Sequence, residues 1–256
     1  MIFYFSATGN CLDAANRLAG SFGDKVLDIV EELKEGCNYH LEEGEKVGIV
    51  SPVHFYGLPM IVEDFIGRMR FDRTPYLYLV LTYGTTPGQA MQRAERVLAK
   101  SGYGLDSKLG VKMPENYVLM FDPPNDTEAK RILGAAYDRI SVFADSVRDG
   151  KAVDMTDPVG VLDRITGIIA RPMYDHGRGT GRFYVDTICT GCGKCVRVCP
   201  SKAIELIDRI PTWTKSKCLR CCACINRCPF KALQFGRSTK KRGRYVNPNV
   251  DIPDRE

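Results

Sequence analysis

Two cysteine-rich stretches, CTGCGKCVRVCP at residues 189–200 and CLRCCACINRCP at residues 218–229, lie in the C-terminal part of this 256-residue sequence. Both have the spacing C-x2-C-x2-C-x3-C-P, which is typical of proteins that hold two [4Fe–4S] clusters. Three closely spaced thiolates can surround one cubane from a tight loop, while the fourth lies about one helical turn further on and points toward the other cluster. The spacing therefore predicts two clusters with crossed ligands, the first held by Cys189, Cys192, Cys195 and Cys228 and the second by Cys218, Cys221, Cys224 and Cys199.

Two other roles for these cysteines match the rest of the sequence poorly. Disulfide bonds would suit a secreted chain, but Met1 is followed directly by an apolar run, without the basic region or cleavage site of a signal peptide. Structural zinc is held by sets of four Cys or Cys and His ligands, whereas this sequence has 3 His and two complete iron–sulfur runs. The region resembles bacterial two-cluster ferredoxins. Because iron-bound thiolates are easily oxidised, we expect a cytoplasmic protein of a reducing, anaerobic cell.

Three cysteines lie outside the predicted ligand set. Cys222 could replace Cys221 or Cys224 as a ligand after oxidative damage, but it is expected to be a bystander, either packed or exposed. Cys11 and Cys37 are expected to pack as small apolar side chains.

The charges divide unevenly along the chain. Residues 1–150 carry 16 Lys and Arg against 21 Asp and Glu, whereas residues 151–256 carry 20 against 10. Part of the basic excess offsets the clusters, and the rest predicts a docking face for an acidic redox partner rather than for nucleic acid, because no recognition motif is present. The longest apolar stretches, such as residues 76–83, are far shorter than the roughly 20 residues of a membrane-spanning helix.

A phosphate-binding loop is predicted near the N-terminus. Residues 2–5 indicate a buried strand, residues 6–10 (SATGN) a polar loop, and residues 11–19 a helix. Such a junction places free N–H groups and the positive end of the helix dipole around an anion. The loop lacks the Lys of a P-loop and the glycine pattern of dinucleotide folds, and so short a motif could also be only a helix cap. Its position after the first strand of an alternating pattern favours the anion site.

The alternation of strands and helices continues through the first 150 residues. Further strands are predicted at residues 25–30, 46–51, 76–82 and 118–121. Helices are predicted at residues 58–69, 88–100 and 126–147, the last of them capped by Asp126 or Thr127. This order predicts an α/β fold with a doubly wound parallel sheet, which binds ligands outside the carboxyl ends of its strands.

Two further loops at these strand ends contain aromatic, Gly and Pro residues, and the three loops together resemble the FMN-binding loops of flavodoxins. The resemblance implies that the phosphate is bound by Ser6, Ala7, Thr8, Gly9, Asn10 and Cys11. One face of the flavin would be covered by Pro52, Val53, His54, Phe55, Tyr56 and Gly57. The pyrimidine edge would be lined by Thr82, Tyr83, Gly84, Thr85 and Gly88. Cys11 stands where flavodoxins usually have a second hydroxyl, and the acidic residues typical of short-chain flavodoxins near the flavin are missing.

Four segments follow from these patterns. We expect a flavodoxin-like FMN-binding domain at 1–150, a connection at 151–182, a two-cluster ferredoxin domain at 183–238, and a basic tail at 239–256. The connection contains a predicted amphipathic helix that spans residues 159–170 and ends at Arg171-Pro172. The ferredoxin domain is an internal repeat with an offset of 29 residues, a small α+β unit with too little apolar core to fold without its clusters. The tail is expected to be an ordered strap that ends at residues 245–248, or a docking face.

The whole chain resembles flavodoxin–ferredoxin fusion proteins of bacteria and archaea. This resemblance implies an electron-transfer protein that passes single low-potential electrons between two [4Fe–4S] clusters and FMN and serves a partner redox enzyme. The alternative is a flavin-dependent oxidoreductase that reduces a small substrate at the FMN, with His54, Tyr56 or Tyr83 as a proton donor. Because the two cysteine loops differ in sequence, we also expect unequal reduction potentials for the two clusters.

Overall fold

A computed structural model describes residues 1–255, apart from the side chains of residues 161, 162, 164, 165, 168, 169 and 171. Its main sheet contains the parallel strands β1 (Ile2–Tyr4), β2 (Val26–Asp28), β4 (Lys46–Pro52), β6 (Tyr76–Tyr83), β7 (Ser107–Lys112) and β8 (Asp154–Met155). They are arranged in the order β2-β1-β4-β6-β7-β8. The first five positions follow the 2-1-3-4-5 order of flavodoxin-like doubly wound sheets, so the predicted fold class is confirmed.

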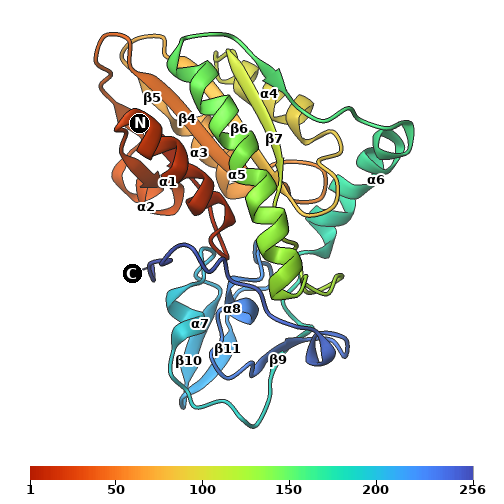
Figure 1. Ribbon diagram of the computed structural model, residues 1–256. Helices are drawn as coiled ribbons and strands as arrows, with labels where there is room; N and C mark the ends of the chain where they lie inside the picture. Colours follow the sequence, from red (N-terminus) through yellow and green to blue (C-terminus); the bar gives the residue numbers. More distant parts are fainter. Residues whose placement is uncertain (256) are drawn as a thin grey trace.

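Helices cover both faces of the sheet (Figure 1). Helices α1 (Asn10–Phe22) and α5 (Asp126–Arg148) pack on one face. The other face is covered by α2 (Ile29–Glu35), α3 (Met60–Arg68) and α4 (Ala90–Lys100). Successive side chains of β1 alternate between the two cores, because neighbouring residues of a strand point to opposite faces. Both faces of the strand are therefore buried, which explains the continuous apolar run at the start of the sequence.

The cysteine-rich part forms a small module built from two antiparallel strand pairs. Strand β9 (Phe183–Val185) pairs with β12 (Leu233–Phe235), and β10 (Ile204–Ile207) pairs with β11 (Ile210–Trp213). Each cysteine loop is followed by a one-turn helix, α7 (Lys194–Arg197) or α8 (Ala223–Asn226). This is the small α+β unit expected for a ferredoxin domain. The remaining elements are the short parallel pair β3 (Asn38–Tyr39) and β5 (Arg70–Phe71) and the 3-10 helix η1 (Thr239–Lys241).

The prediction of a last strand at 118–121 is wrong. The fifth strand of the sheet is β7, and the chain turns at residues 117–120. Val118 and Leu119 are buried, but against the cysteine module rather than in the sheet. A short apolar run indicates that a segment is buried but not which part of the molecule covers it. Strand β7 (SKLGVK) is too polar at its ends to be recognised as a strand.

The connecting helix is longer than predicted. Helix α6 spans Val161–Gly177 and continues past Pro172, where the sequence predicted its end. The reason is tertiary: Tyr174, in the last turns, is 1% exposed, and its hydroxyl donates a hydrogen bond of 3.2 Å to the carbonyl of Leu219 in the cysteine module. Most side chains of the predicted apolar face at 159–170 lie outside the described part of the chain.

Two smaller expectations for the helices are also corrected. Helix α5 is capped by the side chain of Asn125, which accepts a hydrogen bond from the N–H of Glu128, rather than by Asp126 or Thr127. The strand predicted at 25–30 ends at Asp28, whose carboxylate caps α2. Within residues 1–255, none of the helices combines the length and apolarity that crossing a membrane requires.

Candidate metal and cofactor site

The two halves of the repeat bring the eight predicted cysteine ligands together in a crossed arrangement. Cys195 has Cys228 and Cys189 as neighbours. The pKa of its thiol is raised to about 11, mainly by burial and to a smaller extent by these two thiols. Burial also raises the pKa of Cys221 to about 12, and its thiol neighbours are Cys199 and Cys218. Cys228 thus lies near Cys195 of the other run, and Cys199 lies near Cys218, Cys221 and Cys224. The assignment of ligands to two clusters stays a prediction.

The cysteine sulfurs also accept hydrogen bonds from the backbone. The N–H groups of Ala203, Ala232 and Arg220 each lie 3.4 Å from a sulfur, that of Cys199, Cys228 and Cys218 respectively. Such bonds favour the thiolate, the form that binds iron, and metal binding releases the thiol protons. Within residues 1–255, no three His, Cys, Asp or Glu side chains converge closely enough to hold one metal ion. A cubane takes one thiolate at each of four irons, so its ligands need not converge on one point. The donor set fits two such clusters.

The two cysteine loops lie in different surroundings. We call residues 189–195 the outer loop and residues 218–224 the inner loop. Cys192 of the outer loop is exposed to solvent. Cys221 and Cys224 of the inner loop pack against a buried cluster of Val198, Ala223 and Ala7, and Ala7 belongs to the predicted phosphate loop of the sheet domain. The cysteine module therefore presents one loop to solvent and the other to the sheet domain.

The loops also differ in backbone chemistry. Gly191 and Gly193 of the outer loop have φ values of 69° and 74°, a left-handed conformation that glycine adopts without cost. At the equivalent positions the inner loop has Arg220 and Cys222, with φ values of 51° and 61°. A left-handed conformation costs a non-glycine residue about 1–2 kcal/mol. Cys222 is 3% exposed, so the predicted bystander is packed rather than exposed.

The predicted phosphate loop is buried and forms hydrogen bonds with several distant segments. Gly9 has a φ of 100° and immediately precedes α1, while Ser6, Thr8 and Asn10 are each at most 5% exposed. The first N–H groups of α1, at Asn10, Cys11 and Leu12, have no acceptor among the residues that the structure describes. Three free amides at a helix N-terminus, next to a left-handed glycine and buried hydroxyls, are a suitable cradle for a phosphate. The loop therefore fits the phosphate of an FMN.

The second predicted loop is a tight turn. His54 and Gly57 form a bridge, and Phe55 and Tyr56 between them have φ values of 48° and 60°. The Phe55 ring stacks on Tyr174 of α6 at 5.1 Å and 26°. The His54 ring packs edge-on against Phe5 at 6.4 Å and against Tyr174 at 6.2 Å. The turn thus brings aromatic, partly exposed side chains to the carboxyl edge of the sheet, beside the phosphate loop.

The third predicted loop lies next to the other two. The hydroxyl of Thr82 is 3.1 Å from the sulfur of Cys11, which links the third loop to the phosphate loop. A side chain at Gly88 would collide with the Tyr56 ring, which links the third loop to the second. Tyr83 is 8% exposed, and Gly84 lies against Glu115. The remaining predicted residues of these loops, Pro52, Val53 and Thr85, are half-buried or exposed at the same edge.

Sequence reasoning missed a fourth loop at this edge. Asn116 donates a 2.6 Å hydrogen bond to the Thr8 hydroxyl, and the carbonyl of Pro114 accepts a 3.0 Å bond from the Asn10 amide. Tyr117 lies edge-on to Phe55 at 5.5 Å. The only signal in the sequence was the apolar pair Val118 and Leu119, which was assigned to a strand.

The C-terminal strap, residues 245–255, crosses the same edge. Tyr245 donates a 2.9 Å hydrogen bond to the side-chain oxygen of Asn10, and the N–H of Asn247 donates to the carbonyl of Thr8 at 2.8 Å. Arg255 donates to the carbonyl of Ser6 at 2.8 Å. The expected strap therefore exists, but it continues beyond residues 245–248 and runs along the phosphate loop.

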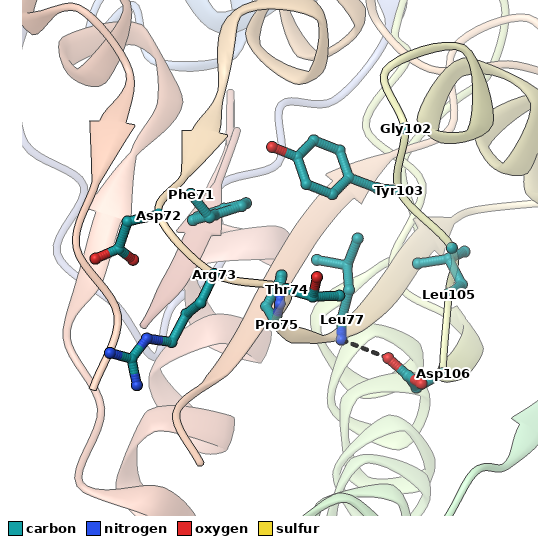
Figure 2. A pocket seen from close by; sticks show the side chains of 11 residues that line it. Phe71, Asp72, Arg73, Thr74, Pro75, Leu77, Gly102, Tyr103, Leu105 and Asp106 are labelled. Carbon is teal, nitrogen blue, oxygen red and sulfur yellow. Dashed lines mark hydrogen bonds between the residues drawn. The ribbon is translucent and has the colours of Figure 1, made fainter. Parts of the chain in front are cut away.

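Two pockets lie elsewhere. One, of about 390 Å³, is at the opposite, amino edge of the sheet, where its lining includes Phe71, Tyr103 and Asp106 (Figure 2). The other, of about 510 Å³, lies between α5 and the β7–β8 edge, and Tyr83 is the one predicted site residue that lines it. Neither of these two pockets is lined by His54 or Tyr56.

Comparison with known proteins identifies the cysteine module. Residues 183–229 match the model of a 4Fe-4S dicluster domain. An uncharacterized protein of Methanocaldococcus jannaschii is 26% identical over 116 residues, which are 44% of this chain and 53% of the relative. The chain thus spans about half the length of this curated relative.

Solved structures similar to part of the chain include a flavodoxin, an azoreductase and a flavodiiron core. Flavodoxin from Megasphaera elsdenii is 18% identical, with 54% of this chain and 99% of that chain covered and a TM-score of 0.32. An azoreductase from Bacillus anthracis is 10% identical, covering 57% and 98%, with a TM-score of 0.37. The Flv1 flavodiiron core from Synechocystis is 17% identical, covering 59% and 36%, with a TM-score of 0.36. The fold assignment itself rests on the strand order of this chain. The chain joins a flavodoxin-like sheet domain to a 4Fe-4S dicluster domain, as the predicted flavodoxin–ferredoxin fusion requires.

Proposed function

We propose that this chain is an electron-transfer protein that carries single low-potential electrons between two [4Fe–4S] clusters and an FMN, and that it serves a partner redox enzyme. The observation that carries this proposal is the buried cluster of Ala7, Val198 and Ala223, which joins the phosphate loop to the cysteine module and has Cys221 and Cys224 packed against it. A metal-ligand loop and a phosphate cradle that share one buried contact are suited to electron transfer within a single chain. Bound clusters supply one-electron steps, and a bound flavin supplies steps of one or two electrons.

The ligands form two sites that lie at different depths. The outer site consists of Cys189, Cys192, Cys195 and Cys228, and the inner site consists of Cys218, Cys221, Cys224 and Cys199. Because Cys192 is exposed, the outer site is the port for a protein partner. Because the inner loop contacts the sheet domain, the inner site stands between that port and the flavin. The basic residues of this half of the chain favour a partner with an acidic docking face.

The residues of the sheet domain would hold and orient the flavin. The free amides of α1 would bind the phosphate, and Gly9 lets the backbone curve around it. Phe55 and Tyr56, placed by their tight turn, would cover one face of the ring system. Tyr174 stacks on Phe55 and is bonded to Leu219, so the same aromatic group that contacts the flavin would also contact the inner loop.

Direct reduction of a small substrate at the flavin is the weaker hypothesis. Its best candidate for a proton donor was His54, whose ring packs edge-on between Phe5 and Tyr174. A ring in that position supports the loop rather than facing a substrate. The pockets at the amino edge of the sheet and beside α5 have neither His54 nor Tyr56 in their lining.

Cofactor content tests the proposal. Protein purified anaerobically should contain about eight irons, eight sulfides and one FMN per chain, since each cubane holds four irons. Reductive titration should show the clusters and the flavin taking up electrons in separate steps. Four irons and no flavin would contradict the proposal. Rapid turnover of a small substrate without any protein acceptor would favour the oxidoreductase.

A further inference from the structure

Two arginine side chains are buried next to the inner site. Arg255 is 3% exposed and Arg227 is 9% exposed. The Arg255 guanidinium lies between the two domains: it donates to the carbonyl of Val198 at 3.4 Å and to the carbonyl of Ser6 at 2.8 Å. Val198 directly precedes Cys199, a ligand of the inner site. Arg255 therefore connects the phosphate loop to the backbone of the inner site.

Each of these arginines has a buried N–H donor without an acceptor. Nε of Arg255 and Nη1 of Arg227 have no hydrogen-bond partner among the described residues. Leaving a buried, charged donor unpaired is costly, so such a group points to an acceptor that belongs at the site. Cluster sulfides and the thiolates that bind them carry negative charge and accept hydrogen bonds. Arg227 and Arg255 both act electrostatically on Cys221.

The carboxylates near these arginines do not cancel their charge at the inner site. Asp28 accepts from Arg255 at 3.1 Å, from the side of the guanidinium that also contacts Ser6. Asp254 pairs with Arg227 at 3.2 Å, but it also pairs with Lys194 and Arg197, so three cations share one carboxylate. Asp251 is the other acidic group that acts on Arg227, and its side chain is exposed.

The cations of the outer loop are placed differently. The Arg197 side chain is 51% exposed, although it donates to the carbonyl of Cys192 at 3.1 Å. The Arg209 side chain is also exposed, and it reaches the carbonyl of Thr190. Water and salt screen an exposed charge much more strongly than a buried one. The exposed Arg197 and Arg209 therefore act weakly on the outer site. Half-buried Arg244 also acts on the outer-site thiol Cys228, whereas the inner site has two more deeply buried arginines, Arg255 and Arg227.

We propose that Arg255 and Arg227 hold the inner site at a higher reduction potential than the outer site, so that electrons entering at the outer site pass inward. A buried positive charge stabilises the reduced site, which is one unit more negative than the oxidised site, and so raises its potential. One electron leaves the outer site as one arrives at the inner site, and a reduced one-electron carrier protein replaces it. This inference rests on the proposed function and adds a direction to it.

The test is a redox titration of the anaerobic holoprotein followed by electron paramagnetic resonance, with the outer-site signal assigned by its change in Cys192→Ser. Arg255→Gln should weaken the affinity of the inner site for its electron about tenfold, a fall of about 59 mV for a one-electron couple. Arg227→Gln should act in the same direction. Arg255→Lys retains the charge and should restore most of the potential. The matched control is Arg197→Gln, which removes an exposed arginine that also pairs with Asp254 and should change either affinity less than about twofold.

Single and double variants of Arg255 and Asp28 separate the effect of the arginine charge on the potential from the effect of opening the domain interface to water. Asp28→Asn removes a negative charge, and the double variant Arg255→Gln/Asp28→Asn removes the pair. We expect the single Asp28 variant to raise the inner potential and the double variant to recover only part of the fall seen in Arg255→Gln, because Asp28 contacts Nη2 of Arg255, whereas Nη1 contacts the inner-site backbone at Val198. Opening the interface to water would instead raise the potential in Arg255→Gln, because solvent stabilises the more highly charged reduced site.

Either that upward shift, or a shift in Arg255→Gln no larger than in Arg197→Gln, would overturn the inference. If Arg255→Gln did not fold, Arg227→Gln and Asp28→Asn would still have to shift the potential in opposite directions. Failure of the proposed function would look different, as missing iron or flavin in the unmodified protein.

Discussion

The outer and inner cysteine loops share one spacing but differ in almost every other respect. The outer loop has glycines at its left-handed positions, an exposed Cys192 and exposed cations. The inner loop has Arg220 and Cys222 at the same positions and is packed against the sheet domain. The spacing of the cysteines thus specifies which groups bind iron. Contact with the sheet domain determines how exposed each loop is to water and to a partner protein.

The largest expected difference is between two adjacent cysteines of the inner loop. Cys221→Ser removes a predicted ligand of the inner site. The iron content should fall by about half, because one of the two cubanes loses one of its four thiolates. Cys222→Ser changes a packed bystander and should retain the full iron content. Iron and sulfide analysis of the two variants shows which of the two cysteines is a ligand. Loss of iron in the Cys222 variant alone would reverse the roles of the two residues.

Iron release should occur in two phases. An oxidant with an iron chelator can reach the outer site through Cys192, whereas the inner site becomes accessible only when the two domains separate. A local opening that costs more than about 1.4 kcal/mol would slow the second phase at least about tenfold. The loss of visible absorbance with time measures both phases. A single phase that releases all the iron would show that depth does not protect the inner site.

A third difference concerns equivalent positions of the two one-turn helices. Asn226 in α8 is 4% exposed; its amide donates to the carbonyl of Asn116 at 2.9 Å and its oxygen accepts from the N–H of Tyr245 at 3.1 Å. Asn226→Ala leaves buried groups unpaired and should cost about 1–3 kcal/mol of unfolding free energy. Arg197, its counterpart in α7, is half exposed, so Arg197→Ala should cost less than about 1 kcal/mol.

Urea unfolding of the iron-loaded protein measures both values. Equal losses would mean that the inner helix is no more firmly attached to the rest of the molecule than the outer one.

The smallest effect is expected at a glycine of the outer loop. Gly191 has a φ of 69°, and a Cβ atom there would lie 2.6 Å from the carbonyl oxygen of Arg209. Gly191→Ala should therefore cost about 1–2 kcal/mol of unfolding free energy. Gly181→Ala is the control, because a Cβ atom at Gly181 would have no neighbour within 4 Å. Thermal unfolding of the two variants tests whether the outer loop needs glycine at this position, where the inner loop has Arg220.

The sequence was sufficient for the features that depend on local pattern. The alternation of apolar strands predicted the doubly wound sheet, and the cysteine spacing predicted that Cys199 would lie near the second run and Cys228 near the first. It failed where burial comes from distant segments. Val118 and Leu119 are apolar because the cysteine module covers them, and α6 continues past Pro172 while Tyr174 is anchored on Leu219.

The contribution of Arg255 to the candidate site was invisible for the same reason. A lone arginine in a basic tail has no local signature, and its position depends on Ser6 and Asp28, which are far away in the chain.

The C-terminal strap has a consequence for the order in which the protein is assembled. Its contacts join residues separated by 235 positions, as between Tyr245 and Asn10, or by 249, as between Arg255 and Ser6. Contacts between such distant residues form late, because closing so long a loop is entropically costly until both ends are already structured. The strap therefore closes last over the phosphate loop. We expect a cofactor that binds at the phosphate loop to enter before the strap closes over it.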